Sequence, residues 1–504
     1  MANIGINLLE TDGKATPSIQ ASATSRAGFI GGTQRGVPGV VKLVTNFTEY
    51  AELFGRFKTG FNTPFAVKGF FDNGGSMAYV TRVYVGTVLS GTAKAVNLVV
   101  NAVGTGALTI SAGYRGQLDP GPWAHAVTVD VFYRALIPAA QGKPAVPASF
   151  DLTIKLDGKQ VESWTYLPVD ASAVAKINDE FTGSQYVTIA LDLVKEFKVG
   201  LETLTLAGGV ESTAMTIAKC DSTTGALALY QTIDLQLVAC PDMPDALIDG
   251  MLSDAEQFCR NRGDCLYVTH AEDKDAAATT TWGASKRASN MYAAAYWPRI
   301  RVQDPESGSR WIPPTGHVMG VMARTDQQRG VWKAPAGNDA RVSGALDVKY
   351  HISDATHTSL VKDGSVNAVR FVSGQGIVVD SARTMSTNVL WQYVNVRLLF
   401  NFVKSSLKAG LRWVVYEPND DALWKKIKHN SVTPFLMGLW RRGAFGPGSP
   451  DQVFSVKCDA ENNPPANIQQ GILNVEVYFY PSRPAETFIL TVGQQEGGGS
   501  ASES

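Results

Sequence analysis

The sequence predicts a multidomain protein of mixed α/β and α+β class, and three observations lead to this prediction. The chain has 504 residues, and at the usual size of a domain this length corresponds to about three domains. Short apolar segments punctuated by glycine and one probable helix precede residue 85, and a strand, loop, helix and strand follow residue 235. The segment between them alternates apolar and polar residues with the two-residue period of strands. We therefore expect an α/β core with a mostly β insertion, followed by a C-terminal α+β domain.

The N-terminal region is expected to form an arm (residues 1–25) and the first part of the α/β core (residues 26–85). A short strand is predicted by alternation in the arm, and its residues are Ile4, Gly5, Ile6, Asn7 and Leu8. Glycine, threonine, proline, serine and alanine follow it, which is typical of a flexible connection. Within residues 26–85, a helix is predicted at 48–54 between short apolar segments.

Residues 86–206 are expected to form an inserted, mostly β domain that faces outward. Strands are predicted at 127–133 and 150–156, with a loop rich in proline and alanine between them. The insertion has glycine-containing junctions and separates two parts of a core whose strands must pair with each other. An outward position follows because the insertion must not interrupt that pairing.

The second part of the core is expected at residues 207–370. A strand at 235–240, a helix at 245–262 and a strand at 266–269 predict one βαβ unit with parallel strands. A second helix is predicted at 286–295, leading into an extended segment at 296–302.

The C-terminal domain is expected at residues 371–486. A long helix should follow Ser386 and Thr387, with one apolar face formed by Trp391, Val394, Leu398 and Phe402. Two further helices are predicted, one capped by Asn419 and one capped by Thr433 with Pro434 in its first turn. Strands are predicted at 452–458 and 471–480. Residues 487–504 are expected to form a C-terminal arm and flexible tail, whose strand comprises Phe488, Ile489, Leu490, Thr491 and Val492.

Composition argues against several classes of protein. The 45 basic and 46 acidic residues nearly cancel, so the basic stripe that a nucleic-acid coat needs is not expected. The five cysteines are widely spaced and predict buried, reduced thiols rather than disulfides or a zinc site. The N-terminus lacks the regions of a signal peptide, and every long apolar stretch carries charges. We expect neither direct nucleic-acid binding nor membrane insertion.

Motifs for catalysis are scarce. The chain contains no P-loop, no nucleophile elbow and no zinc-protease motif. An α/β enzyme remains the alternative from a different class, with His317, Arg324 and Asp326 as its polar cluster; a hydrogen-bonded histidine at a helix start is the simpler interpretation of His317. The carboxylates of Asp242, Asp245 and Asp249 could bind a metal, but beside prolines they are more typical of turn and first-turn helix residues. The expectation is no catalytic residue, no cofactor and no metal.

The two terminal strands need partners, because a single strand cannot satisfy its own backbone hydrogen bonds. Each strand either pairs back onto its own chain or completes a sheet in a neighbouring molecule by β-augmentation. Sequence patterning leaves both arrangements open.

An ordered series of motifs over nearly the whole chain resembles the contractile tail sheath proteins, the family of phage tail sheaths and R-type pyocin sheaths. The C-terminal half carries Tyr296-Trp-Pro-Arg-Ile-Arg-Val-Gln-Asp-Pro305, Pro313-Pro-Thr-Gly-His317, Arg329-Gly-Val-Trp-Lys-Ala-Pro-Ala336, Ala382-Arg-Thr-Met-Ser386, Trp391-Gln-Tyr-Val-Asn-Val-Arg397, Val415-Tyr-Glu-Pro-Asn419 and Pro484-Ala-Glu486. Looser matches in the other half are Ala27-Gly-Phe-Ile-Gly-Gly32, Gly74-Gly-Ser-Met-Ala-Tyr-Val-Thr-Arg82, Pro120-Gly-Pro-Trp123 and Leu206-Ala-Gly-Gly-Val-Glu211.

The resemblance implies a structural subunit rather than an enzyme. Such subunits stack as hexameric rings around an inner tube, and the metastable extended lattice contracts to drive the tube through a cell envelope. The implied partners are other copies of the chain, the inner tail tube protein, and baseplate and tail terminator proteins. The implied location is the virion tail, after assembly in the bacterial host cytoplasm, with a tailocin or other non-viral contractile injection system as the alternative.

A basic stretch is expected to face the tube. Between Lys404 and Arg442 there are eight basic and three acidic residues, although the whole chain has a net charge of −1. The resemblance places the C-terminal domain innermost, so Lys425, Lys426 and Lys428 are the candidates for contact with acidic tube residues. The alternative is a solvated helix end whose charges suit the helix dipole.

Overall fold

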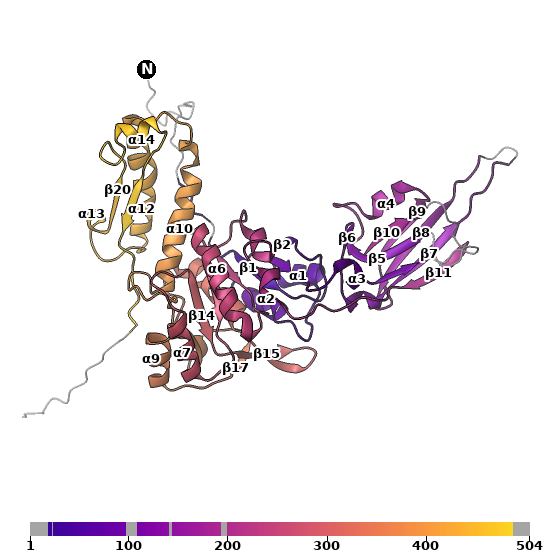
Figure 1. Ribbon diagram of the computed structural model, residues 1–504, viewed down its shortest axis with the longest axis horizontal. Helices are drawn as coiled ribbons and strands as arrows, with labels where there is room; N and C mark the ends of the chain where they lie inside the picture. Colours follow the sequence, from indigo (N-terminus) through magenta and orange to yellow (C-terminus); the bar gives the residue numbers. More distant parts are fainter. Residues whose placement is uncertain (1–18, 23, 97–107, 141–143, 193–198, 487–504) are drawn as a thin grey trace, which may run out of the picture.

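The protein has three units arranged along its longest axis (Figure 1). The computed structural model describes residues 19–22, 24–96, 108–140, 144–192 and 199–486. A C-terminal unit lies at one end, an α/β core lies in the middle, and a mostly β unit inserted in the core lies at the other end. The predicted arm strands at 4–8 and 488–492 lie outside the described residues.

The core is built on one eight-stranded sheet that combines both parts of the chain. Its strand order is β19 (Gly376–Val379), β18 (Val366–Val372), β14 (Ala293–Trp297), β13 (Leu266–His270), β12 (Leu237–Ala239), β1 (Ala27–Gly31), β3 (Ala78–Arg82) and β2 (Val41–Val44). The inner pairs are parallel, including β1 with β12, whereas the outermost pairs β2–β3 and β18–β19 are antiparallel. The predicted βαβ unit is confirmed, because β12 and β13 are parallel and are connected by α6 (Ile248–Arg262).

Helices cover both faces of this sheet, as parallel sheets require. Successive residues of β1 enter different cores: Phe29 packs with α2 (Thr63–Asp72) and α8 (Thr315–Arg329), whereas Ile30 packs with α6. Helices α7 (Ala276–Lys286) and α9 (Asp354–Lys362) contribute to the second face. The alternation explains why both residues are fully buried.

Glycines allow α2 and α8 to approach closely. A Cβ atom at Gly69 would lie 2.3 Å from the ring of His317, and one at Gly316 would lie 2.1 Å from the backbone oxygen of Ala66. Real Cβ atoms do not approach other atoms so closely, so any larger residue would push the helices apart. This contact fixes α8, which also carries Arg324 and Asp326.

The predicted helix at 286–295 is wrong. The helix of this region is α7, ten residues earlier, where the Asp275 side chain caps it by accepting a hydrogen bond from the amide of Ala278. Residues Ala293–Trp297 instead form strand β14, which is buried between β13 and β18. The local helix propensity of three consecutive alanines is overridden by the pairing of their backbone with strands β13 and β18.

The inserted unit has its own hydrophobic core and two sheets. One sheet has the order β10 (Val187–Leu191), β5 (Leu108–Tyr114) and β4 (Lys94–Val96), with β6 (Gln117–Leu118) beside β5. The other has the order β11 (Gly200–Thr205), β7 (Val127–Arg134), β8 (Ser149–Leu156) and β9 (Lys159–Pro168). The chain enters and leaves the unit side by side, because the amide of Val210 donates a hydrogen bond to the carbonyl of Gly91 at 3.0 Å.

A buried ion pair joins the inserted unit to the core. Arg82 Nη1 at the end of β3 lies 2.6 Å from Asp119 Oδ1, and the two side chains are 1% and 2% exposed. Arg82 also donates to the carbonyls of Gly36 and Pro120 at 2.6 and 2.7 Å, while Asp119 accepts from the amide of Gly36 at 2.8 Å. Burial raises the pKa of Asp119, and the adjacent Arg82 opposes this shift. The junction is therefore a fixed contact rather than a free linker.

The C-terminal unit contains two long antiparallel helical segments and a small sheet (Figure 1). The first helix is α10 (Val394–Gly410). The second segment comprises α11 (Asp421–Lys425), a π-helical segment at Lys426–Val432 and α12 (Thr433–Arg441). Short helices α13 (Pro450–Val453) and α14 (Pro465–Gln469) flank β20 (Phe454–Lys457), which pairs with β21 (Glu476–Phe479).

Several predicted boundaries in this unit are wrong. Trp391 precedes α10 instead of contributing to its apolar face, because residues 388–391 form a turn and Tyr393 bridges to Arg383. Helix α11 is capped by Asp420 and not by Asn419, because the Asp420 carboxylate accepts a hydrogen bond from the amide of Leu423 at 2.8 Å. The strand predicted from 452 begins at Phe454, after α13.

Thr433 does not cap a helix, which is a further correction. The residue before it, Val432, already has helical dihedral angles, so the chain is helical without a break from Asp421 to Arg441. The π-helical segment accommodates the junction before Pro434, which lacks an N–H group for the helix ladder. Lys425, Lys426 and Lys428 consequently lie within a helix and not at its end, so a helix C-terminus does not explain them.

Candidate functional site

Helix α10 is the central element of the candidate site, because polar residues buried on it bind other segments of the chain. Asn395 Nδ2 donates to the carbonyls of Trp332 and Ser482 at 2.8 and 3.2 Å. Asn401 Nδ2 donates to the carbonyl of Cys265 at 3.1 Å. Buried amides are retained where they satisfy backbone groups, so these residues fix α10 to both the core and the C-terminal segment.

The described segment that precedes β1, which we call the N-terminal root (residues 19–26 except 23), is bound near the C-terminal end of α10. The amide of Ser22 donates to Ser406 Oγ at 3.0 Å. Ile19 packs against Gly410, where an added Cβ would lie 2.7 Å from Ile19 Cγ1. Ser25 donates its hydroxyl hydrogen to the carboxylate of Asp326 on α8, and burial raises the pKa of Asp326 to about 7.

The last described segment of the chain is bound at the opposite end of α10. We call it the C-terminal root (residues 481–486). Asn395, in the first turn of the helix, holds the carbonyl of Ser482. Arg383 donates from Nε and Nη2 to the two oxygens of Glu486 at 2.8 and 2.5 Å. Burial alone would raise the pKa of Glu486, but the hydrogen bonds from Arg383 hold it below its usual value. Such two-point pairs are among the strongest charge-assisted hydrogen bonds.

Ile19 of the N-terminal root and Ser482 of the C-terminal root therefore lie near opposite ends of α10, because Ile19 packs against Gly410 and Ser482 is bound by Asn395. Helix α10 has 17 residues, which at 1.5 Å per residue corresponds to about 25 Å. The predicted arm strands continue from these roots, beyond the described residues. Each arm accordingly starts from a defined position on the same rigid element.

A two-stranded sheet packs against α10 and leads into the C-terminal root. Strands β20 and β21 pair from Phe454–Phe479 to Lys457–Glu476 and form no ladder with a third strand among the described residues. The sheet is fixed to α10 because the rings of Phe479 and Phe400 stack with centroids 4.2 Å apart. Two strands alone are marginally stable, and their outer edges carry backbone groups that another strand can bind.

The lysines expected to face the tube differ in their surroundings. Lys425 forms an ion pair with Asp421 at 2.6 Å, and both side chains are more than two-thirds exposed. Lys426 lies over the ring of Trp413, with its Nζ 4.6 Å from the centroid. Lys428 forms no ion pair with any described residue. Lys426 and Lys428 thus have no acidic partner among the described residues, whereas Lys425 is paired with Asp421.

The polar cluster of the enzyme alternative does not form. His317 is buried against Gly69, Arg324 donates to the carbonyls of Asn73 and Arg341, and Asp326 binds Ser25. Burial lowers the pKa of His317 to about 4, so it is neutral at pH 7. Its Nδ1 has no hydrogen-bond partner among the described residues.

Metal binding finds no support in the aspartates near residue 242. Asp242 accepts hydrogen bonds from the amide of Gly32 at 2.8 Å and the hydroxyl of Thr63 at 2.6 Å. Asp245 and Asp249 bind Arg299 and Lys286, respectively. Over the residues that the structure covers, no group of three or more histidine, cysteine or acidic side chains is placed to hold a metal ion. All five cysteines are free and buried, which confirms that prediction.

Sequence reasoning missed the structural role of Asp119 and Asp242. Both carboxylates bind residues far away in the chain: Asp119 pairs with Arg82, and Asp242 binds the chain at Asn62 and Thr63. The motif Pro120-Gly-Pro-Trp123 beside Asp119 was the only available signal. It contributed only to the family resemblance and could not indicate the partner.

Comparison with known proteins identifies the family. The fold and the site define a multidomain α/β structural subunit without a catalytic centre among its described residues. Residues 221–385 match the family described as the phage tail sheath protein central domain, and residues 386–495 match the phage tail sheath C-terminal domain. The adjoining matches span more than half of the chain, which therefore belongs to the phage tail sheath family. Its members are structural proteins, so the chain is not an enzyme.

Curated relatives include the tail sheath proteins of two phages. The protein of Vibrio phage KVP40 is 28% identical over 184 residues, which are 36% of this chain and 26% of the relative. That of Enterobacteria phage T4 is 25% identical over 184 residues, covering 36% and 27% of the two chains. The match thus spans about a quarter of the length of these relatives.

Solved structures share the fold over almost the whole chain. The helical sheath of the anti-feeding prophage in its contracted state has a TM-score of 0.59 and 18% identity, covering 98% of this chain and 100% of the other. A sheath tail protein of Listeria innocua has a TM-score of 0.63 and 12% identity, covering 92% and 96%. Within the described parts of the chain, no helix is both long and apolar enough to cross a membrane.

Proposed function

We propose that the protein is the subunit of a contractile tail sheath, which assembles as stacked hexameric rings around an inner tube and contracts to drive that tube through a cell envelope. The observation that carries this proposal is the position of the two roots at opposite ends of α10, beside a two-stranded sheet. Membership of the sheath family and the shared fold with a contracted sheath support it. The subunit would act as part of a phage tail, assembled in the host cytoplasm, with baseplate and terminator proteins at the sheath ends.

In this proposal the arms connect neighbouring subunits. Ile4–Leu8 and Phe488–Val492 each add a strand to a sheet of another copy, with β21 in residues 471–480 as the acceptor. A strand of about five residues forms several backbone hydrogen bonds, each of which contributes roughly 1 kcal/mol net. Because the connection repeats at every joint, rings can move relative to one another without separating.

The energy of contraction would reside in the lattice. A metastable extended arrangement shortens when subunits move as rigid bodies into larger or better-packed interfaces. Buried contacts such as Arg82–Asp119 support the rigid-body description, since they fix the inserted unit to the core.

Deletion of residues 1–10 tests the arm connection. The truncated protein should fold as a monomer, because the N-terminal root at Ile19, Ser22 and Ser25 remains, but it should form no ordered tubes. Sedimentation and negative-stain electron microscopy provide the measurement, and a deletion of residues 498–504, beyond the C-terminal strand, is the matched control. Normal tubes from the truncated protein would contradict the role of the N-terminal strand.

The inner surface is proposed to include Lys425, Lys426 and Lys428. Exposed charge pairs contribute about 0–1 kcal/mol each and are screened by salt, which suits contacts that must release together. Lys425→Glu with Lys426→Glu should weaken assembly on the tube and leave tube-free polymers intact. Unchanged assembly on the tube at low salt would remove this helix from the interface.

The inserted unit, predicted at residues 86–206, is proposed to face outward. It lies at the opposite end of the molecule from the C-terminal unit, which is proposed to lie innermost (Figure 1). Because Gly91 and Val210 are hydrogen-bonded neighbours, a short linker between them can replace the unit. The shortened protein should still fold and form a sheath mesh; complete loss of folding would place this unit in the core.

A non-viral contractile injection system is the second candidate. Its support is the shared fold with sheaths of the anti-feeding prophage and of an extracellular contractile injection system called PVC, whose sheath has a TM-score of 0.58 and 17% identity. Electron micrographs of native particles distinguish the two, since only a phage tail carries a capsid.

A further inference from the structure

The loop between α10 and α11 presents a tyrosine to solvent. The side chains of Val415 and Tyr416 are 64% and 102% exposed, and Tyr416 has a φ of +71°. A positive φ is uncommon for residues other than glycine and is a strained conformation for a bulky side chain. Strain of this kind persists only where neighbouring contacts enforce it.

Neighbouring contacts hold this loop in place. Asn419 accepts a hydrogen bond from the indole of Trp424 at 2.7 Å and donates one to the carbonyl of Ile472 at 3.0 Å. The amide of Glu417 donates to the carbonyl of Val414 at 3.1 Å. The protein therefore fixes Tyr416 outward without any contact that buries it. Exposed aromatic residues held rigidly are typical of interface anchors.

Unpaired acidic residues follow this tyrosine in the loop. Glu417 and Asp420 are exposed, and neither forms an ion pair with a described residue. Asp421 is also exposed, but it is paired with Lys425. The knob, defined here as Val415, Tyr416 and Glu417, thus combines an aromatic ring with negative charge.

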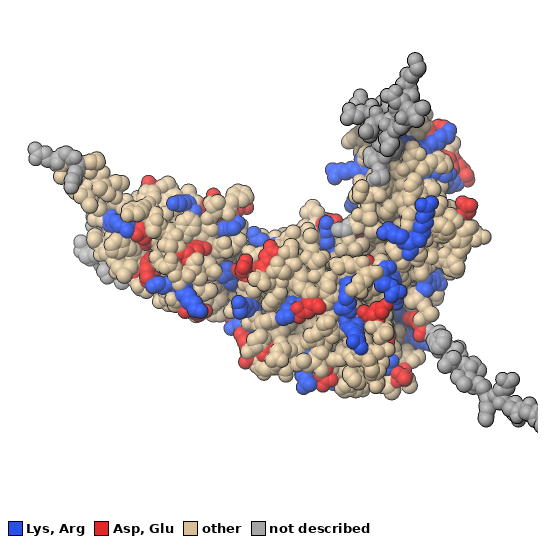
Figure 2. Space-filling view, turned by 180° about the vertical axis from the view of Figure 1, so that it is seen from behind, with Lys and Arg blue, Asp and Glu red and all other residues tan. Residues whose placement is uncertain are grey.

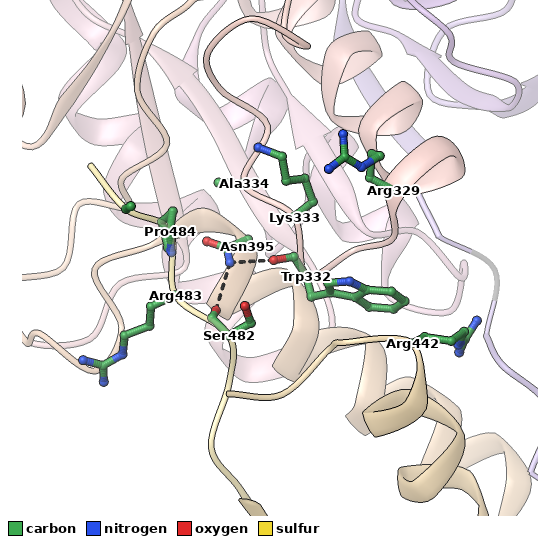
Figure 3. Close-up of a pocket in the computed structure, with 10 residues that line it drawn as sticks. Arg329, Trp332, Lys333, Ala334, Asn395, Arg442, Ser482, Arg483 and Pro484 are labelled. Atoms are coloured by element: carbon green, nitrogen blue, oxygen red, sulfur yellow. Dashed lines mark hydrogen bonds between the residues drawn. The ribbon is translucent and has the colours of Figure 1, made fainter. Parts of the chain in front are cut away.

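A cationic pocket lies at the other end of the C-terminal unit. Its volume is about 420 Å³, and its lining includes Trp332 and four basic residues, Arg329, Lys333, Arg442 and Arg483, but no carboxylate (Figure 3). Figure 2 shows basic side chains along this part of the molecule, between the core and the C-terminal unit. We call this pocket the socket.

The charges of the socket are largely unpaired. Arg329 forms an ion pair with Asp339 at 2.9 Å, whereas the other three cations have no ion pair with a described residue. Arg442 lies over the Trp332 ring, 5.4 Å from its centroid. Arg329 and Arg442 lie at the ends of α8 and α12, where cations suit the helix dipole. Lys333 and Arg483 lie in loops, so helix dipoles do not account for them.

We propose that the knob of one copy enters the socket of the next copy, so that subunits contact one another head to tail. The proposal rests on the self-assembly proposed above. The ring of Tyr416 would pack against Trp332, while Glu417 and Asp420 face the basic rim. Complementary charge selects a second copy as the occupant, because each chain carries both the acidic knob and the basic socket.

One subunit cannot fill its own socket. The helical segment from Asp421 to Arg441 contains 21 residues and spans about 32 Å, with the knob before its start and the socket at its end. The contact is therefore heterologous, joining different surfaces of two copies. Interfaces of this kind produce rings or open helical arrays.

Engineered cysteines test the contact directly. Tyr416→Cys and Lys333→Cys in one chain should give a ladder of disulfide-linked oligomers when assembled tubes are oxidised. Each single variant is the control, since the five native cysteines are buried and free. Ordered tubes that give no more cross-linking than the single variants would overturn the inference and leave the proposed function intact. Failure of the unmodified protein to form tubes at all would instead contradict the proposed function.

Substitution of the knob gives a second test. Tyr416→Ala should raise the protein concentration needed for tube formation by about tenfold or more, as expected for an interface anchor. Tyr166→Ala is a matched control, because Tyr166 is also a strongly exposed tyrosine with positive φ but lies in the inserted unit. Equal effects of the two substitutions would overturn the inference. A defect of Tyr416→Ala that occurs only in the presence of the inner tube would assign the knob to the tube instead.

A charge exchange completes the test. Arg442→Glu and Glu417→Arg should each weaken assembly, and the two together in one chain should restore it at least in part. Absence of any restoration would contradict the pairing of these two surfaces.

Discussion

Removal of Asp119 should detach the inserted unit from the core. In the folded protein its carboxylate pairs with Arg82 at 2.6 Å and accepts the amide of Gly36 at 2.8 Å, with both charged side chains almost fully buried. Asp119→Ala leaves the guanidinium without a counter-charge and the amide without an acceptor. Loss of one partner from a buried pair costs about 3–5 kcal/mol. Because Arg82 keeps two carbonyl acceptors, we expect a value near 3 kcal/mol.

Hydrogen exchange measures this loss locally. The amide of Gly39 donates to the carbonyl of Arg82 at 3.0 Å and keeps this acceptor in the variant, so peptides covering residues 33–39 report on opening of the junction. A loss of about 3 kcal/mol corresponds to roughly 100-fold faster exchange. Asp339→Ala is the control, because its pair with Arg329 is about half exposed and should contribute about 0–1 kcal/mol.

Two results would refute this reasoning. Acceleration below tenfold at residues 33–39, or no larger than in the Asp339→Ala control, would show that the ion pair does not hold the junction. The double variant Arg82→Met with Asp119→Leu should be less destabilised than Asp119→Ala, since no unpaired charge remains. A double variant as unstable as the single one would assign the effect to packing.

Three further predictions concern the core and the C-terminal root. His317 has a pKa of about 4 in the folded protein and near 6.5 in the unfolded chain, so the free energy of unfolding should fall by about 3 kcal/mol as the pH drops from 6.5 to 4. In the His317→Asn variant, the midpoint of thermal unfolding should depend less on pH over that range. Gly69→Ala should lower the free energy of unfolding by about 1–3 kcal/mol, because the added methyl group clashes with His317. Gly438→Ala should raise it by about 0.5–1 kcal/mol, because the space around this helix position is open. Equal urea midpoints for the two variants would contradict this. Arg383→Gln should free Glu486 and speed cleavage after Glu486 by a glutamyl endopeptidase severalfold, and unchanged cleavage would show that the pair does not hold the root.

Patterns within a few residues were sufficient to predict several elements. The strand, helix and strand at 235–269 are present as β12, α6 and β13, and the helix predicted at 48–54 is α1 (Phe47–Phe54). These predictions succeed because apolar periodicity and turn residues act between neighbours in the chain. The ordered motifs were likewise enough to indicate the sheath family.

Predictions failed where the surroundings override local preference. Alanines at 293–295 favour a helix locally, yet they form a strand because their backbone pairs with β13 and β18. Thr433 and Pro434 have the pattern of a helix start, but a π-helical segment connects them to the preceding helix. In both cases the deciding interaction involves residues that the local pattern does not include.

The sequence by itself determined the fold class, the family, the free cysteines and the order of most core elements, because these depend on local periodicity and on motifs. Only the tertiary structure decided which polar residues hold the molecule together: Asp119 with Arg82, Glu486 with Arg383, and the two roots with α10. It alone also placed an exposed Tyr416 and a cationic pocket at opposite ends of one unit. The physical reason is that burial and charge pairing arise between residues distant in the chain, and packing brings them together.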